Sequence, residues 1–135
     1  MSGIGIYGIG TDVVELARMR RLWERWGERA VRHILCAGEA ERLGRARDSA
    51  RFLAMHFAAK EAVAKALGTG FCPRMTLHDI EVVPDSLGRP EIVFSEAGTA
   101  FVAERGGGET HISLTDDAGI AFAVCVMLKG VRSEK

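Results

Sequence analysis

The pattern of apolar and polar positions predicts a fold of mixed helices and strands. Residues 4–9 form an apolar segment with interspersed glycines, which is typical of a buried strand. Two longer segments, 13–35 and 50–67, carry apolar side chains every three or four residues, as amphipathic helices do. Gly27 interrupts the first of these helices, and Gly68 is a natural C-terminal cap for the second.

The second half of the chain predicts paired strands and one more helix. The strands are expected at residues 79–83, 91–94, 111–115 and 120–128. Ser95 is expected to cap a helix that runs to Arg105, and a short helix is expected at 38–44. This order favours a small α+β domain with an antiparallel sheet packed with a long helix. We expect a single domain over residues 1–130, with 131–135 as a frayed tail.

The first long helix has an apolar face and an arginine face. Its apolar residues are Leu16, Met19, Trp23, Trp26 and Ala30, and its arginines are Arg18, Arg21, Arg25, Arg29 and Arg32. The two series are offset by about 200° around a helix, so the arginines should point away from the core and both tryptophans toward it. Residues 16–51 hold ten arginines and five acidic residues, although the whole chain has no net charge. This favours a particular acidic partner over bulk nucleic acid.

Length, cysteine content and hydropathy exclude several classes of protein. A chain of 135 residues is long enough for one domain. Cys36, Cys72 and Cys125 are far apart, which argues against a disulfide framework or a zinc site and favours reduced thiols in the cytoplasm. No apolar segment has the ~20 residues of a membrane span. We also expect no signal peptide, because no basic segment precedes a long apolar stretch.

Two acidic residues are candidate metal ligands. Asp12 follows the first apolar strand, where it could cap the next helix together with Glu15, bind a divalent cation, or do both. Glu61 lies on the second long helix, where a lone glutamate is usually solvated, but its neighbours here are small and apolar. Magnesium prefers one or two protein carboxylates together with phosphate oxygens. Asp12 and Glu61 could supply that pair.

Cations and glycines accompany Glu61 on the same helix. Lys65 lies four residues later and shares its face, either as a surface ion pair or as a cation beside a diphosphate; Lys60 precedes Glu61 directly. The turn Gly68-Thr69-Gly70 would by itself be only a helix stop, but beside a carboxylate and an ammonium it can hold a metal-bound phosphate. His56 is a further candidate for phosphate contact, when protonated.

Four segments, in this order, resemble 4'-phosphopantetheinyl transferases of the holo-acyl-carrier-protein synthase type. They are GIGTDVVELAR at 8–18, FAAKEAVAKALGTG at 57–70, DIEVVPDSLGRP at 79–90 and HISLTDDAGIAFAVCV at 111–126. The resemblance implies a cytoplasmic enzyme that moves 4'-phosphopantetheine from coenzyme A to a serine of an apo-acyl carrier protein, with Mg²⁺. It also implies a homotrimer with active sites between subunits. A carrier of fatty-acid biosynthesis is the default substrate, and a specialised carrier is the alternative.

The resemblance assigns roles to individual residues. Asp12 and Glu61 match the metal-binding acids, and Lys65 matches the lysine beside the diphosphate. The segments that match the coenzyme A cleft are Gly68-Thr69-Gly70, Gly88-Arg89-Pro90 and Ser113-Leu114-Thr115. Arg18 and Arg25 match positions that meet the carrier, an acidic helical bundle, and Arg21 lies on the same face. A serine hydroxyl is a poor nucleophile at neutral pH, so the transfer also needs a base, for which the candidates are Glu61 and a magnesium-bound water held by Asp12.

Three positions depart from the family pattern, and one other class of function competes with it. His56, Cys72 and Asp116 replace residues that are often arginine or histidine in the family, which bears on affinity for the adenosine 3'-phosphate. The competing class is a binding module whose arginine–tryptophan helix lies on an anionic membrane or on nucleic acid. That alternative leaves the acids, Lys65 and the glycine turn without a role.

Overall fold

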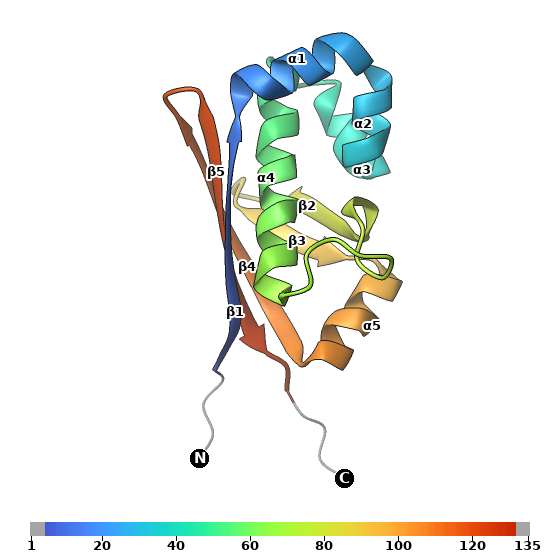
Figure 1. Cartoon of the computed structure of the whole chain (residues 1–135), viewed down its shortest axis with the longest axis vertical. Coiled ribbons are helices and arrows are strands. Elements are labelled where there is room, and N and C mark those ends of the chain that lie inside the picture. Colours follow the sequence, from blue (N-terminus) through green and yellow to red (C-terminus); the bar gives the residue numbers. More distant parts are fainter. Residues whose placement is uncertain (1–4, 132–135) are drawn as a thin grey trace.

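The computed structural model describes residues 5–131 (Figure 1). In chain order the elements are β1 (Ile6–Glu15), α1 (Leu16–Trp26), α2 (Glu28–Ile34), α3 (Ala37–Leu43), α4 (Ser49–Leu67), the 3-10 helix η1 (Leu77–Asp79), β2 (Ile80–Pro84), β3 (Pro90–Phe94), α5 (Glu96–Arg105), β4 (Gly107–Asp117) and β5 (Ile120–Lys129). The predicted α+β class is confirmed. Ile4 of the first predicted strand and residues 132–135 of the predicted tail lie outside the described residues.

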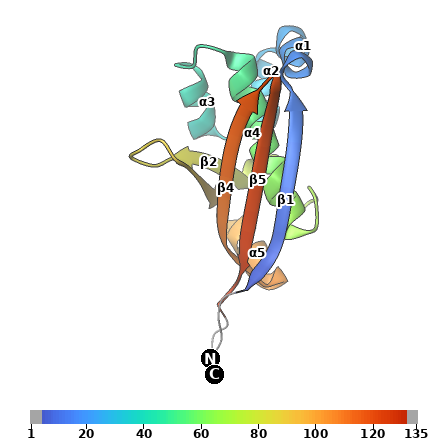
Figure 2. The same ribbon diagram turned by 90° about the vertical axis from the view of Figure 1, so that its left-hand side faces the viewer.

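A three-stranded antiparallel sheet covers one side of α4. Its strand order is β1-β5-β4, and β2 and β3 form a separate hairpin. Asp12 of β1 and Leu114 of β4 are both paired with Ala123, which lies between them on the central strand β5. Figure 1 shows α4 between the sheet and a second layer of helices, and Figure 2 shows the other face of the sheet with no helix over it. Within residues 5–131, no helix combines the length and apolar character needed to cross a bilayer.

Two glycines allow β1 to lie directly on the backbone of α4. A Cβ atom at Gly8 would collide with the carbonyl oxygen of Ala66, and one at Gly10 with that of Ala62. Any side chain at either position would therefore push the strand off the helix. The glycines scattered through this apolar segment are thus what brings Asp12, two residues after Gly10, beside α4.

The central helix α4 is buried more widely than its sequence pattern indicates. The predicted stripe is correct at Ala59, Ala62 and Ala66, but Phe52 and Met55 are only partly buried. Other faces of the helix are also buried, at Leu53, Ala54, Ala58, Val63, Ala64 and Leu67. A single apolar stripe underestimates this burial because α4 is enclosed by the sheet on one side and by the helical layer on the other.

The first predicted helix begins too early, and the predicted capping role of Asp12 is wrong. β1 continues to Glu15, which is the N-cap of α1 and makes no side-chain cap hydrogen bond. Pairing with β5 satisfies the backbone through this stretch, so Asp12 lies within a strand instead of at a helix start. The predicted strand therefore ended too soon, at Ile9.

Gly27 divides the predicted helix into α1 and α2, as the sequence indicated. Its φ of 47° is outside the helical region, and α2 sets off in a new direction. The expected core position of Trp26 is wrong, because its side chain is 40% exposed at the end of α1. The prediction for α5 is confirmed: the Ser95 side chain accepts a hydrogen bond from the Gly98 N–H, and Gly106 ends the helix in the left-handed conformation.

Candidate active site

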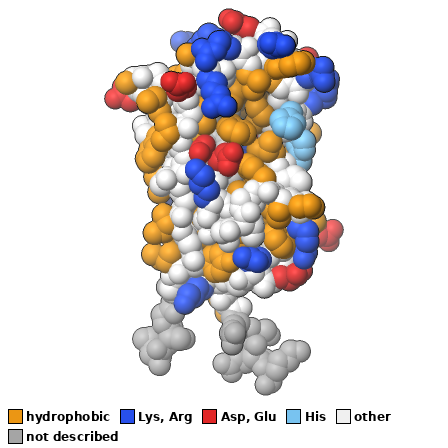
Figure 3. All heavy atoms as spheres, viewed as in Figure 1, with side chains coloured by type: hydrophobic (Ala, Val, Ile, Leu, Met, Phe, Trp, Pro, Cys, Tyr) orange, Lys and Arg blue, Asp and Glu red, His pale blue; other side chains and the backbone are white. Residues whose placement is uncertain are grey.

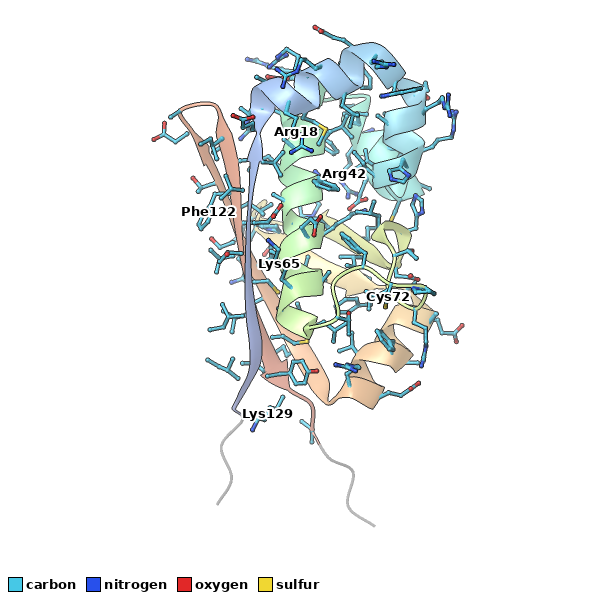
Figure 4. All side chains as sticks on the ribbon, in the orientation of Figure 1. Arg18, Arg42, Lys65, Cys72, Phe122 and Lys129 are labelled. Carbon is cyan, nitrogen blue, oxygen red and sulfur yellow. The ribbon has the colours of Figure 1, made fainter. Side chains whose placement is uncertain are left out.

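Asp12 and Lys65 meet where β1 crosses α4. The Lys65 Nζ donates to Asp12 Oδ1 at 3.0 Å and to the carbonyl oxygen of Thr11 at 3.0 Å. Figure 4 shows Lys65 on the flank of α4 beside β1. Among the described residues no ion pair joins Lys65 to Glu61, so of the two alternatives for Lys65 the surface pair along the helix is not formed. Lys65 instead joins α4 to β1 through its contacts with Asp12 and Thr11.

Glu61 is the second acid of this site. Burial raises the pKa of its carboxyl group, the negative charge of Asp12 raises it further, and the positive charge of Lys65 partly opposes both effects. The side chain is half-buried, between the apolar interior and solvent. Figure 3 shows acidic and basic side chains in contact near the middle of this face of the molecule. Asp12, Glu61 and Lys65 therefore form one electrostatic cluster, although the first is far from the others in sequence.

The donor set of this cluster fits a divalent cation that shares its ligands with a substrate. Two neighbouring carboxyl groups that are partly buried do not readily ionise together unless a cation lies between them. No group of three or more histidine, cysteine, aspartate or glutamate side chains with metal-binding geometry occurs in residues 5–131. A cation held by Asp12 and Glu61 would need oxygen ligands from outside the protein. Mg²⁺ typically binds in this way, since it keeps several water ligands and also binds substrate phosphates.

The predicted Gly-Thr-Gly turn ends α4 one turn after Lys65. Gly68 has a φ of 92° and donates its N–H to the carbonyls of Ala64 and Lys65, and Gly70 has a φ of 63°. The Thr69 hydroxyl donates to the carbonyl oxygen of Gly70 at 2.8 Å. A Cβ atom at either glycine would meet no atom within 4 Å. The turn therefore borders open space next to the charged cluster.

The segment Gly88-Arg89-Pro90 lies at the β2–β3 hairpin, away from α4. Gly88 has a φ of 87°, and Asp85 Oδ1 accepts hydrogen bonds from the N–H groups of Leu87 and Arg89. A hollow of ≈ 670 Å³ lies between this hairpin and β4, lined by residues 89–94 and 108–112. Figure 2 shows the hairpin projecting beyond β4. This hollow is lined by none of the three residues of the charged cluster, and its place in a coenzyme A cleft stays a prediction.

Ser113 and Thr115 are not brought to the acids within one chain. Both are exposed on β4, whereas the alternate residues Ile112 and Leu114 pack against the core beside α4. They therefore point to the outer face of the sheet, while Asp12 faces α4. A site that used all of these residues would need more than one copy of the chain.

The structure does not bring His56 to Asp12 and Glu61. Its ring stacks on Phe52 with centroids 4.0 Å apart, and its Nδ1 lies 2.8 Å from the Phe52 carbonyl oxygen. Burial lowers the pKa of His56, which keeps the ring neutral at pH 7. A contact between His56 and a phosphate therefore has no support in the geometry of the chain.

The predicted arginine face is exposed. Arg18, Arg21 and Arg25 all lie in solvent on α1. The guanidinium groups of Arg25 and Arg29 lie 5.2 and 5.0 Å from the centroid of the Trp26 ring. A shallow hollow of ≈ 300 Å³ lies beside them, lined by Leu22, Trp26, Arg29, Ala30, His33 and Ile34. The exposed apolar part of this surface was not predicted, because the helical pattern placed Trp26 toward the core.

Two ionic contacts escaped the sequence analysis. Lys60, which directly precedes Glu61, is fully buried and pairs with Glu39 at 2.7 Å, so it is not available to a phosphate. The alanine- and valine-rich sequence around Lys60 was the one feature that could have indicated its burial. Arg51 donates twice to Asp116, at 3.0 and 2.7 Å, and this lowers the pKa of Asp116. Nothing in the sequence links those two residues, which are 65 positions apart.

The fold and this cluster define a 4'-phosphopantetheinyl transferase. The family model described as "4'-phosphopantetheinyl transferase superfamily" matches residues 8–125. Within that superfamily, the chain belongs to the holo-[acyl-carrier-protein] synthase family. It is 46% identical over 121 residues to the holo-[acyl-carrier-protein] synthase of Aromatoleum aromaticum, with 88% of this chain and 96% of the relative covered. The predicted family and enzyme class are confirmed.

Solved structures of similar proteins have the same fold. The holo-[acyl-carrier-protein] synthase of Neisseria meningitidis has a TM-score of 0.87 and 36% identity, with 90% of this chain and 98% of that chain covered. The Helicobacter pylori synthase, solved in complex with coenzyme A, has a TM-score of 0.78 and 28% identity, with 88% and 98% covered. The comparisons thus support the α+β architecture along most of the chain.

Proposed function

We propose that this chain transfers 4'-phosphopantetheine from coenzyme A to a serine of an apo-acyl carrier protein of fatty-acid biosynthesis. The products are the holo-carrier and adenosine 3',5'-bisphosphate. The main support is the cluster of Asp12, Glu61 and Lys65 beside an open glycine turn. Further support comes from similarity to proteins named holo-[acyl-carrier-protein] synthase and to one solved with coenzyme A.

Asp12 and Glu61 would together hold Mg²⁺ against the diphosphate of coenzyme A. The bound cation would neutralise charge on the diphosphate as the phosphoryl group transfers. The raised pKa of Glu61 agrees with this role, because a neighbouring cation offsets the cost of ionising a carboxyl group beside Asp12. Lys65, held next to Asp12, would donate hydrogen bonds to the departing phosphate oxygen.

In the proposed transfer, one bond to phosphorus forms and one breaks, and the protein contributes only the residues named above. The serine oxygen of the carrier forms a bond to the β-phosphorus, and the bond from that phosphorus to the bridging oxygen breaks. The hydroxyl proton passes to a base, for which we propose the Glu61 carboxylate, and the adenosine 3',5'-bisphosphate leaves with the bridging oxygen.

The arginine face of α1 would bind the carrier. Arg18, Arg21 and Arg25 are exposed on α1, and within residues 5–131 none of them forms an ion pair, so an acidic helical bundle would complement them. The adjoining hollow around Leu22 and Trp26 could accept an apolar side chain at the centre of such a contact. Charge would thus orient the carrier, and apolar contact would hold it.

The uncovered face of the sheet supports assembly into a homotrimer. Ile9 and Val13 are 59% and 55% exposed on β1, and Phe122, Val124 and Val126 line the adjacent strand on the same face. An apolar surface of this kind is unusual on a monomer. Ser113 and Thr115 lie on that face as well, so a neighbouring copy could bring them to coenzyme A. We also propose a cytoplasmic location, in line with the three free cysteines.

Mass spectrometry of an apo-carrier tests this proposal directly. The carrier is incubated with the protein, coenzyme A and Mg²⁺, and its intact mass is measured. A mass gain of one phosphopantetheine group is expected, and the Asp12→Asn protein should produce it at least ~100-fold more slowly. An unmodified carrier after prolonged incubation with the unsubstituted protein would contradict the proposal.

A further inference from the structure

A buried ammonium lies on the side of α4 that faces away from the sheet. Lys60 is fully buried, and its three N–H groups are all used. They donate to Glu39 Oε1 at 2.7 Å, to the carbonyl oxygen of Ile34 at 2.8 Å and to that of Leu77 at 2.9 Å. Lys60 thereby joins α4 to the end of α2, to α3 and to η1.

The partner carboxylate is equally well satisfied. Glu39 has no exposed surface; its Oε1 also accepts from the Cys36 N–H at 2.8 Å, and its Oε2 accepts from the Val82 N–H at 2.7 Å. The pair therefore extends the connection from α4 to the start of α3 and to β2. Burying two charges is costly and adds little net stability, but a pair with all its hydrogen bonds satisfied can fix one arrangement of the elements around it.

The ion pair is adjacent to the proposed metal ligand. Lys60 directly precedes Glu61, and one residue corresponds to about 100° around a helix. Lys60 is two positions, or about 200°, from Ala62, whose carbonyl meets Gly10 of β1. α4 is thus held from two opposite sides at the same height, by the glycine contact with the sheet and by the Lys60–Glu39 pair. Both contacts fix the rotation of the helix, and hence the direction of Glu61.

We propose that Lys60 and Glu39 are positioning residues, which orient α4 so that the Glu61 carboxylate faces Asp12. Neither residue touches the substrate, since both are enclosed by protein. This inference rests on the proposed function, because it concerns the metal and diphosphate site. It predicts that loss of the pair affects metal binding and turnover more than it affects carrier binding.

The test compares Lys60→Met, Glu39→Gln and the double variant with the unsubstituted protein. Binding of Mn²⁺ in the presence of coenzyme A is measured by electron paramagnetic resonance, and kcat and KM are measured for transfer. All values are expressed per folded molecule, at a temperature well below each unfolding midpoint. Metal affinity and kcat should fall roughly 10-fold to 100-fold, as for residues that orient metal ligands, while the KM for the carrier should not change. The double variant should lose no more than the worse single variant, because the residues act as a unit.

Val102→Ala is the matched control. Val102 is buried on α5, so its truncation lowers stability without touching the ion pair. Wild-type metal affinity and kcat in Lys60→Met and Glu39→Gln, or equal losses in Val102→Ala, would overturn the inference. If Lys60→Met does not fold, Glu39→Gln carries the test, since it keeps the volume and an acceptor oxygen. An unsubstituted protein that binds Mn²⁺ but transfers nothing would count against the proposed function instead.

Discussion

The ammonium of Lys65 lies 3.0 Å from Asp12 Oδ1, so α4 and β1 meet through a charged contact at the edge of the core. The lysine side chain is 51% exposed, and ion pairs this accessible contribute little to stability. The contact is therefore better explained by a role in binding a charged substrate than by a role in folding. Glu61, whose pKa responds to both residues, belongs to the same unit.

The two acids should be essential for transfer and dispensable for folding. Asp12→Asn and Glu61→Gln keep the side-chain volumes but remove the charges that would hold a divalent cation. We expect turnover to fall at least ~100-fold in each variant, because charge stabilisation in the transition state is lost. Transfer is measured by the mass shift of the carrier and folding by circular dichroism. Near-normal turnover in either variant would refute the metal-binding role.

The raised pKa of Glu61 should appear in the dependence of stability on pH. A carboxyl group whose pKa is higher in the folded state binds its proton more tightly there than in the unfolded chain. Its favourable contribution is therefore complete at pH values below the ordinary glutamate pKa and is lost as the pH rises through the raised value. Without divalent cations, the melting temperature of the protein should decline relative to Glu61→Gln across that window. Parallel curves for the two proteins would show that the pKa is not raised.

The same experiment has an internal check. Asp12→Asn removes the second cause of the shift but not the first, which is burial. The pH-dependent difference in melting temperature that Glu61→Gln causes should therefore be smaller in the Asp12→Asn background than in the unsubstituted protein, but it should not vanish.

A methyl group at Gly10 should separate β1 from α4. Its Cβ would collide with the Ala62 carbonyl oxygen, which belongs to helical backbone and cannot move aside freely. Gly10→Ala should therefore destabilise the fold by about 1–3 kcal/mol, measured by denaturant unfolding. Gly5→Ala is the control, because a Cβ there would meet only the flexible side chain of Lys129, at 3.5 Å. Equal stability of the two variants would contradict the close-packing argument.

Much of this architecture follows from local sequence pattern. The Ser95 cap, the Gly27 break and the Gly68 stop each depend on the chemistry of one residue, and the structure has all three. The position of Asp12 could not be derived in this way. Its backbone partner is Ala123, and pairing at that separation extends β1 beyond the point where an aspartate would usually start a helix.

The candidate site also has one part that local sequence predicts and another that depends on contacts between distant segments. Glu61 and Lys65 share one helix, so their proximity to each other could be expected, but the contact of Lys65 with Asp12 depends on how β1 lies on α4. The distinction between Lys60 and Lys65 likewise depends on which side of α4 the sheet covers. Local periodicity does not contain that information when a helix is buried nearly all round.

Charge reversal on α1 should weaken carrier binding selectively. Arg18→Glu combined with Arg25→Glu replaces two exposed positive charges by negative ones, which would repel an acidic partner. We expect kcat/KM for the carrier to fall at least roughly tenfold, with the KM for coenzyme A unchanged. The loss should diminish as salt is added. Arg105→Glu, on α5, is the control for each single variant, Arg18→Glu or Arg25→Glu, because all three change the net charge by the same amount. Similar effects of the α1 variants and the control, or on both substrates, would exclude a specific docking face.

A charge on the outer face of the sheet should prevent assembly. Val124 lies on the central strand β5, between Thr11 and Ser113 in the sheet register, so Val124→Asp would bury a carboxylate in any interface formed there. Size-exclusion chromatography with light scattering should give a trimer for the unsubstituted protein and a species near the 14.6 kDa chain mass for the variant. Transfer should be lost together with the trimer, because Ser113 and Thr115 of one copy could no longer reach the acids of another. Ala103→Asp, exposed on α5, should remain trimeric and active. A monomeric unsubstituted protein with full activity would exclude shared sites.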